Sequence, residues 1–354
     1  MDKVKISKVN ILLLIFVSLL ISGPYIATAM IDFFEGTFQG EFIRSGSGLN
    51  VLWLIIGQYG FILVPVIVFA KINKLNFKRV FRLNPVSIPT IVLTVVIAVV
   101  GWMLSQYATI ILTHLYSIIF NIPSEKLFEG LKDFGVEKII PENAFLGFFL
   151  IALTPAICEE ALFRGVVLKA YENRGTIRAI FISAILFSII HFSIIRTIGP
   201  LIIGIIAGYL VVKSNSIIPG AIAHFTFNGL SLSLFYLKDM LPEGEANFPD
   251  FQQYLALMSS AIFYIAIIAL CIWVFKYFNS SRKEINSRNI IHRFFYNIVF
   301  LGSPKVKASF NKAIATVYND FISIISHWPI IIILIIFLIY NYNEVSFFKD
   351  IPTR

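Results

Sequence analysis

The chain has 354 residues, of which 58% are hydrophobic and 14% are charged, whereas a typical soluble domain is about 45–50% apolar and about 25% charged. This composition excludes a water-soluble fold, because so much apolar surface could not be hidden from water. The net charge of +9 does not indicate nucleic-acid binding, since the basic residues lie in short loops beside apolar segments, where they orient a membrane protein. The chain has two cysteines, Cys158 and Cys271, so neither a disulfide framework nor a cysteine-rich zinc site is available.

Nine apolar runs along the chain are candidate membrane-spanning helices, because about 20 residues of helix cross the hydrocarbon core of a bilayer. They are Val9–Met30, Val51–Ala70, Ile88–Phe120, Ala144–Val167, Arg178–Ile195, Gly199–Val212, Ile217–Leu237, Tyr254–Phe278 and Trp328–Tyr342. The third run is longer than one crossing requires, so we expect it to be tilted or to continue past the membrane. The sequence predicts an all-α, polytopic membrane helix bundle with about eight or nine transmembrane helices.

The first run has a second interpretation. It follows a basic start and precedes Ala27-Thr28-Ala29, which resembles the cleavage site of a signal peptide. Its length favours a retained first helix, because the apolar part of a signal peptide usually has about 7–15 residues. Later in the chain, Gly204 and Gly208 form a GxxxG pattern, which is typical of closely packed membrane helices.

The loops between these runs alternate in charge. Basic residues cluster before the first run, from Lys71 to Arg82, near Arg174, at Lys213 and after Arg282, whereas the intervening loops around Glu41, Glu129 and Glu243 are acidic on balance. Because positive loops stay on the cytoplasmic side, we expect a multi-pass cell-membrane protein with a cytoplasmic N-terminus. The longest polar connector, Asn279–Asp320, is equally compatible with an interfacial helix and with a solvated loop.

Ionisable side chains within the apolar runs concentrate in one stretch of the chain. This stretch contains Glu159, Glu160, Arg164, His191 and His224, with Asn228 on the same run as His224. A charged group at the bilayer centre costs roughly 2.5–3.5 kcal/mol on insertion scales, so such groups usually face a bundle interior or a water-filled cavity. Their concentration therefore predicts one polar site.

Helical spacing separates the two adjacent glutamates. Residues four apart lie about 40° apart around a helix and adjacent ones about 100° apart, so we expect Glu160 to pair with Arg164 and Glu159 to face other helices. His224 and Asn228 are also four apart and share one face. A carboxylate, two imidazoles and an amide supply a general base and oxyanion donors, which indicates a hydrolase.

Three motifs carry a family resemblance, in order and each within an apolar run. Glu159 to Arg164 fits EExxxR, Phe187 to His191 fits FxxxH, and His224 to Asn228 fits HxxxN. Together they resemble the CPBP family of intramembrane proteases, also called the Abi or CAAX amino-terminal protease family, which includes the Rce1-type prenyl-protein endopeptidases. The resemblance covers about Ala144–Leu237. This implies a catalytic core at 144–237, between N-terminal helices at 1–143 and, at 238–354, C-terminal helices with a basic cytoplasmic loop.

The resemblance implies a role for each motif residue. Glu159 looks like the base that activates water, assisted by His191; His224 and Asn228 look like oxyanion stabilisers; Glu160 and Arg164 look like their support. A mechanism without a cofactor is favoured, and the alternative is zinc held by Glu159, His191 and His224 with one open position. The implied substrate is a membrane-associated protein or peptide, with or without a prenyl group.

Two other functions are compatible with polar groups in a membrane bundle. An ion-coupled transporter would spread such groups along a pathway and would carry broken helices in matched halves. A non-catalytic immunity or scaffold factor would keep the bundle without the chemistry. The concentration of charges in one stretch favours a site over a pathway, and the intact motif residues favour a catalyst.

Overall fold

The computed structural model describes residues 4–33, 46–124, 126–127, 143–237, 240, 251–279 and 327–350. Regular structure within these ranges is entirely helical, which confirms the predicted all-α class. The acidic loops around Glu41, Glu129 and Glu243, and residues 280–320 of the basic connector, lie outside the described residues. Their predicted sides of the membrane remain predictions.

The described helices fall into three groups along the chain. The first part contains α1 (Ile6–Phe33), α3 (Gly46–Ile55), η1 (Ile56–Leu63), α4 (Val64–Ile72), α5 (Phe77–Val80) and α6 (Ile88–Phe120). The central part contains α9 (Ala144–Gly147), η2 (Phe148–Leu153), α10 (Thr154–Glu160), η3 (Ala161–Val167), α11 (Leu168–Tyr171), η4 (Glu172–Arg174), α12 (Thr176–Ile189), α13 (Ile198–Ser214) and α14 (Ile218–Leu237). The last part contains α15 (Phe251–Asn279) and α18 (Trp328–Asp350).

Six helical stretches in the described part of the chain are long and apolar enough to cross a membrane. They are Ile6–Gly23, Val51–Ile72, Ile88–Phe120, Ala144–Arg174, Ala256–Lys276 and Trp328–Lys349. The helices α12 and α13 are apolar but shorter, and α14 is a further helix of 20 residues. The protein is therefore a multi-pass membrane protein, as predicted.

Each of the nine predicted runs coincides with helix, but eight of them differ from the observed helices by one to eight residues at one or both ends. The helix α6 has the predicted bounds Ile88–Phe120. The helix α12 ends at Ile189 rather than at Ile195, because Phe192 adopts a left-handed backbone conformation with φ 51° that stops the helix. The helix α18 continues past Tyr342 to Asp350.

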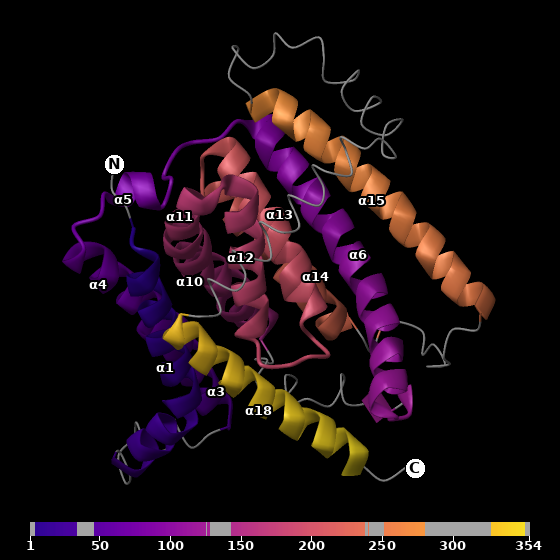
Figure 1. The fold of residues 1–354 in the computed structure, drawn as a ribbon, viewed down its shortest axis with the longest axis horizontal. Coiled ribbons are helices and arrows are strands. Elements are labelled where there is room, and N and C mark those ends of the chain that lie inside the picture. The colour runs from indigo at the N-terminus through magenta and orange to yellow at the C-terminus, as the bar shows by residue number, and fades with distance from the viewer. Residues whose placement is uncertain are drawn as a thin grey trace.

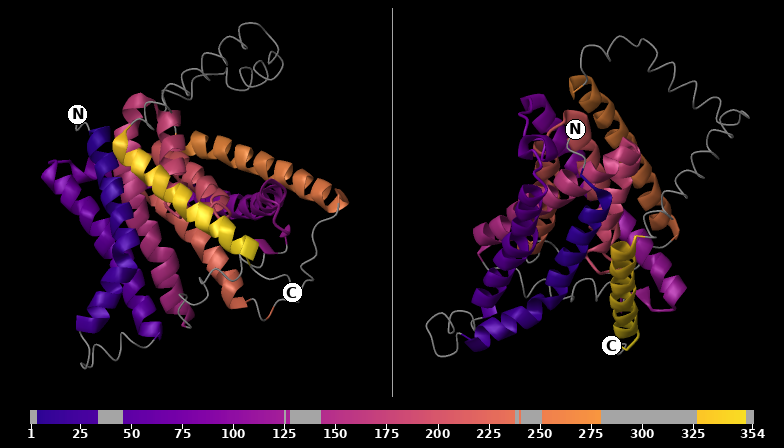
Figure 2. Two further views of the ribbon diagram at one scale, coloured as in Figure 1. Left: turned by 60° about the horizontal axis from the view of Figure 1, so that its bottom comes forward. Right: turned by 60° about the vertical axis from the view of Figure 1, so that its left-hand side comes forward.

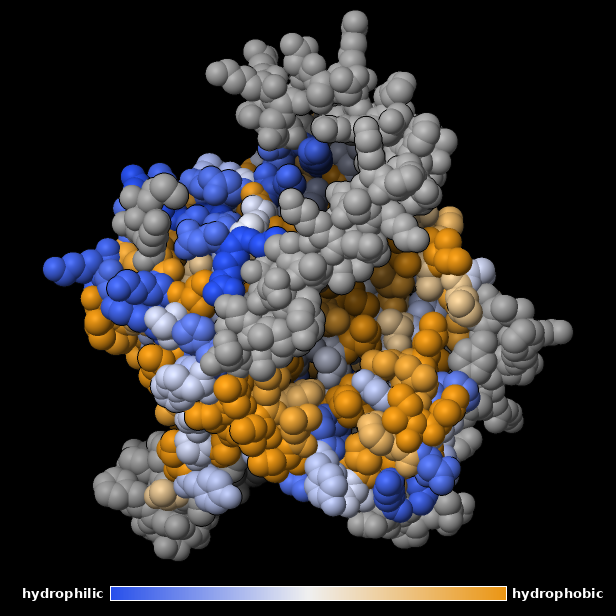
Figure 3. Space-filling model, in the orientation of Figure 1, coloured by the Kyte–Doolittle hydropathy of each residue, from blue (hydrophilic) through white to orange (hydrophobic). Residues whose placement is uncertain are grey.

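The central helices form a core that the outer helices surround (Figure 1). The helix α6 packs against α13 and α14 on one side and against α15 on the other, while α18 crosses the bundle and contacts α1 (Figure 2). Broad apolar areas face outward (Figure 3). Ile262 on α15 and Leu338 on α18, for example, are 67% and 63% exposed. Such a surface is suited to contact with lipid rather than water.

The predicted GxxxG contact lies between α12 and α13. A Cβ added at Gly204 would lie 2.9 Å from the Ala184 Cα atom, and one at Gly208 would lie 3.2 Å from the side chain of Ile180. Only glycine allows the two backbones to approach this closely. This contact fixes the end of α12, where Phe187 and His191 lie, beside the central helices.

Three π-helical segments, η1, η2 and η3, interrupt α-helices within the described residues. A π-turn carries an extra residue, which shifts the helical face and disturbs the backbone hydrogen bonds, so side chains from neighbouring helices are needed as partners. Here Ser183 Oγ donates to the Phe163 carbonyl at 2.9 Å, and Arg82 Nη1 donates to the Arg164 carbonyl at 3.3 Å. Segments of this kind are frequent at functional sites.

Candidate active site

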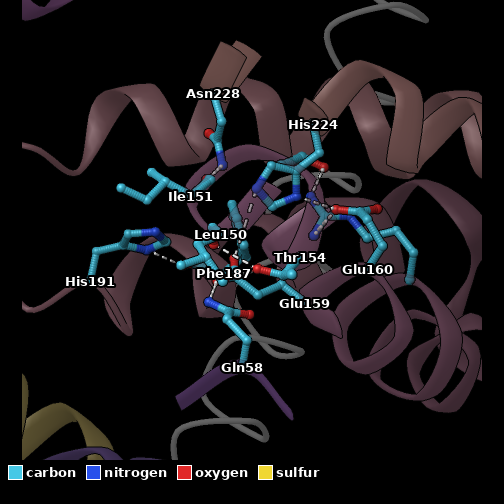
Figure 4. A network of polar contacts seen from close by, with 12 residues as sticks. Gln58, Leu150, Ile151, Thr154, Glu159, Glu160, Phe187, His191, His224 and Asn228 are labelled. Carbon is cyan, nitrogen blue, oxygen red and sulfur yellow. Dashed lines mark hydrogen bonds and ion pairs between the residues drawn. The ribbon is translucent and has the colours of Figure 1, made fainter. Parts of the chain in front are cut away.

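The six residues predicted from the motifs lie on three neighbouring parts of the central core, and Figure 4 labels all of them except Arg164. Glu159 and Glu160 end α10, Arg164 lies in η3, His191 lies in the turn after α12, and His224 and Asn228 lie on α14. The helix α14 contacts α10, η2 and α13. Folding thus brings the residues of the three motifs together in one group of side chains.

The predicted ion pair between Glu160 and Arg164 forms at the centre of this group. Arg164 Nη1 lies 3.0 Å from Glu160 Oε1, and both side chains are fully buried. Arg164 Nη2 also donates to the Gly204 carbonyl at 3.3 Å, and its guanidinium lies 4.6 Å from the centre of the Phe187 ring. A buried cation needs such partners, because removing it from water without them is costly.

His224 connects the two glutamates. Its Nδ1 atom lies 3.0 Å from Glu160 Oε1, and its Nε2 atom lies 3.8 Å from Glu159 Oε2. A carboxylate accepts hydrogen bonds, so Nδ1 carries the proton and Nε2 is directed at Glu159. The sequence placed Glu160 with Arg164 alone; the structure adds His224 as a second partner.

The Glu159 carboxylate is the more accessible of the two, with a side chain that is 13% exposed. Gln58 Nε2 donates to Glu159 Oε1 at 2.9 Å. Gln58 lies in η1, far from the motifs along the chain, and sequence reasoning missed it. Its Oε1 atom is buried and has no hydrogen-bond partner among the described residues, so it is an acceptor located beside Glu159.

His191 and Asn228 flank the network without bonding to it. His191 Nδ1 lies 2.8 Å from the Phe187 carbonyl, and Asn228 Nδ2 donates to the Ile151 carbonyl in η2 at 3.2 Å. The Phe187 ring makes edge contacts with both histidines, with centroid distances of 5.1 Å to His191 and 5.5 Å to His224. Neither His191 nor Asn228 hydrogen-bonds to Glu159 in this structure.

An apolar cavity of about 480 Å³ adjoins Glu160. It lies among α4, α5, α10 and α14, and its wall includes Phe77, Phe81, Leu153 and Phe225. Glu160 is the one ionisable residue of its lining. The volume is in the range of ligand pockets, which are typically about 300–1,000 Å³.

The three candidate zinc ligands do not fit a metal in this arrangement. Among the described residues, no group of three His, Cys, Asp or Glu side chains is placed to hold an ion. His224 Nε2 and Glu159 Oε2 are 3.8 Å apart, but His191 does not complete a group of three ligands with them, and a catalytic zinc ion needs three protein ligands.

Comparison with known proteins found one family similarity, in the part of the chain that carries the motifs. Residues 141–230 match the sequence model of a family described as type II CAAX prenyl endopeptidase Rce1-like. The matched segment contains all three motifs but not Gln58, and it confirms the resemblance that the motifs indicated. No match was found among curated proteins or among solved structures.

Proposed function

From the match of residues 141–230 to the Rce1-like family, we propose that the protein is an intramembrane endopeptidase that hydrolyses peptide bonds in a membrane-associated protein or peptide. The observation that carries this proposal is the Glu159 carboxylate, which is held by Gln58 at 2.9 Å and faces His224 Nε2 at 3.8 Å. It lies within a bundle of apolar helices. A carboxylate is energetically costly there, and such groups usually mark a functional site.

In the proposed reaction, Glu159 takes a proton from water as the water oxygen attacks the peptide carbonyl. His191 assists in holding the water. Glu159 then gives the proton to the leaving amine, so the carbon–nitrogen bond breaks and the base is regenerated. A positioned general base contributes about 10²–10⁴ in rate.

The oxyanion that forms on the carbonyl would be stabilised by donors on α14. Asn228 uses one amide proton on Ile151 and has a second one to offer. His224 donates from Nδ1 to Glu160, so its Nε2 atom can donate to an oxyanion only as an imidazolium. One such donor is worth about 10²–10³ in rate.

The proposed donor role places His224 beside two carboxylates. The site contains two carboxylates and one buried guanidinium, so a protonated His224 makes the total formal charge zero. Glu160 would then hold the His224 ring in position and compensate its charge, as buried carboxylates do beside catalytic histidines. Glu160 is therefore proposed to serve both Arg164 and His224.

The apolar cavity beside Glu160 is the proposed place for an apolar part of the substrate. Its lining contains aromatic and branched side chains from four helices, which suits a large apolar side chain or an attached lipid better than a polar one. A substrate that lies in the bilayer could bring either group to the site.

The proposal is tested by reconstituting the purified protein in liposomes with a panel of membrane peptides, some prenylated near the C-terminus and some unmodified. Mass spectrometry of the products is expected to show cleavage at defined bonds. A transporter would instead move ions or protons without cleaving any peptide, and a scaffold or immunity factor would do neither. Chelators are expected to leave the cleavage intact; loss of activity restored by stoichiometric zinc would overturn the metal-free mechanism.

A further inference from the structure

The connection between α12 and α13 carries His191 and is a short, strongly bonded loop, residues 190–197. Phe192, directly after His191, has φ 51°, a conformation that bulky residues rarely adopt without support from their surroundings. Ser188 Oγ on α12 donates to the Thr197 carbonyl at 2.6 Å, and within the loop Thr197 Oγ1 donates to the Ser193 carbonyl at 2.5 Å. The position of His191 depends on how this loop is held.

The C-terminal helix α18 holds the loop through one face. Tyr340, Glu344 and Phe348 are four residues apart, so they lie on successive turns of the same side. Tyr340 contacts the Phe192 ring with a centroid distance of 5.1 Å, and Phe348 packs in an apolar cluster with Ile195. The loop thus lies along α18, with its residue order matching the order of the turns.

Glu344 makes the polar contact in the middle of this face. Its Oε1 atom accepts a hydrogen bond from Ser193 Oγ at 2.6 Å, and its Oε2 atom accepts one from the Ile194 backbone N–H at 3.0 Å. The residue is 6% exposed. A carboxylate at this depth in an apolar helix is costly unless it is bonded and usually marks a functional role.

We infer that Glu344 is a positioning residue for the proposed hydrolysis: through Ser193 and Ile194, α18 holds the loop so that His191 is directed at the site of Glu159. This inference rests on the proposed function in one respect, because the proposed function assigns His191 to the reaction. His191 is exposed in this structure, and its side chain is held on one side by the Phe187 carbonyl and ring. The contacts between α18 and the loop therefore support the backbone of His191 as well.

The contact between α18 and the loop joins two parts of the chain that the family match separates. The loop lies within the matched residues 141–230, whereas α18 lies about a hundred residues beyond them. The C-terminal helix therefore contributes to the site from outside the segment that carries the motifs.

The test compares Glu344→Gln, Glu344→Leu and Ser193→Ala with the wild type in the liposome assay, with all rates expressed per folded molecule. Leucine removes both acceptors, glutamine keeps one, and Ser193→Ala removes one donor while leaving α18 intact. We expect the kcat of Glu344→Leu to fall by about 10-fold or more with KM nearly unchanged, because small displacements of a reacting group can cost up to about 10²-fold. The kcat values of Glu344→Gln and Ser193→Ala should lie between those of Glu344→Leu and the wild type. Tyr342→Phe, on an exposed part of the same helix, is the matched control and should keep wild-type kcat.

Hydrogen exchange of the Ile194 amide provides a readout that does not depend on catalysis. Its exchange should accelerate in Glu344→Leu and remain at the wild-type rate in Tyr342→Phe. Unchanged exchange in Glu344→Leu would refute the inference, as would faster exchange accompanied by a wild-type kcat. Failure of the proposed function would look different, because the wild type itself would then cleave no peptide.

Discussion

Replacing Glu160 with glutamine tests whether this residue only stabilises the fold or also serves the reaction. Both Glu160 and Arg164 are fully buried, and their charged atoms are 3.0 Å apart. The substitution leaves the Arg164 cation without its counter-ion, and breaking a buried pair in this way costs about 3–5 kcal/mol. The variant is therefore expected to show a lower thermal unfolding temperature in detergent and a lower yield.

A second substitution separates stability from catalysis. In the double variant Glu160→Gln/Arg164→Met no buried charge is left unpaired, and replacing a whole buried pair is often close to neutral. Methionine also suits the aromatic contact with Phe187 that Arg164 now makes. Unfolding temperature should largely recover. Turnover should not recover, because His224 Nδ1 then lacks the carboxylate that holds it. We expect turnover per folded molecule to remain about 10-fold or more below that of the wild type.

The assay pairs thermal unfolding with turnover per folded molecule for the wild type, Glu160→Gln and the double variant. Wild-type turnover in the folded double variant would refute the proposed role of Glu160 at His224. Wild-type stability in the single variant would refute the estimate for the buried ion pair.

Three further predictions concern other parts of the bundle. Gln58→Leu removes the donor to Glu159 and should lower turnover by about 10-fold with little change in unfolding temperature; unchanged turnover would show that Gln58 does not hold the base. Gly204→Ala places a Cβ 2.9 Å from the Ala184 Cα atom and should destabilise the protein by about 1–3 kcal/mol, whereas Gly57→Ala, which meets nothing within 4 Å, is the control and should not. The alternating loop charges predict that cysteines introduced next to Lys74 and Arg282 are labelled from the cytoplasm, and that cysteines introduced next to Glu129 and Glu243 are labelled from outside. Labelling of both sets from one side would refute the topology.

The long helices and the motif residues were predictable because their signals are local. An apolar run such as Ile88–Phe120 has few alternatives to a helix in lipid, since every backbone group must be bonded internally. The pairing of Glu160 with Arg164 follows from a spacing of four residues on one helix. These features depend on near neighbours in the chain, so a single sequence is sufficient to derive them.

Contacts between distant helices were not predictable in the same way. Gln58 is the one amide side chain in the run Val51–Ala70, and this isolated polar residue was the available signal. Its partner, however, depends on how η1 is rotated against α10. The π-helical segments change that rotation by an extra residue, and no pattern in the sequence marked them.

The end of α18 shows how a local rule can be outweighed by a tertiary contact. The predicted run stopped at Tyr342, two residues before the charged Glu344. In the structure the helix continues to Asp350, since Ser193 and Ile194 satisfy the Glu344 carboxylate. The partners come from a loop about 150 residues earlier, so the apolar pattern of α18 alone gave no information about them.

The most direct measurement of the central claim is the turnover of Glu159→Gln per folded molecule in liposomes. Glutamine keeps an oxygen that can accept from Gln58 and removes the base, so the variant should fold as well as the wild type. We predict that its turnover falls by at least about 10², while folded Glu160→Gln retains measurable cleavage. Near-normal turnover of Glu159→Gln, together with an inert but folded Glu160→Gln, would contradict the account and reverse the roles of the two glutamates.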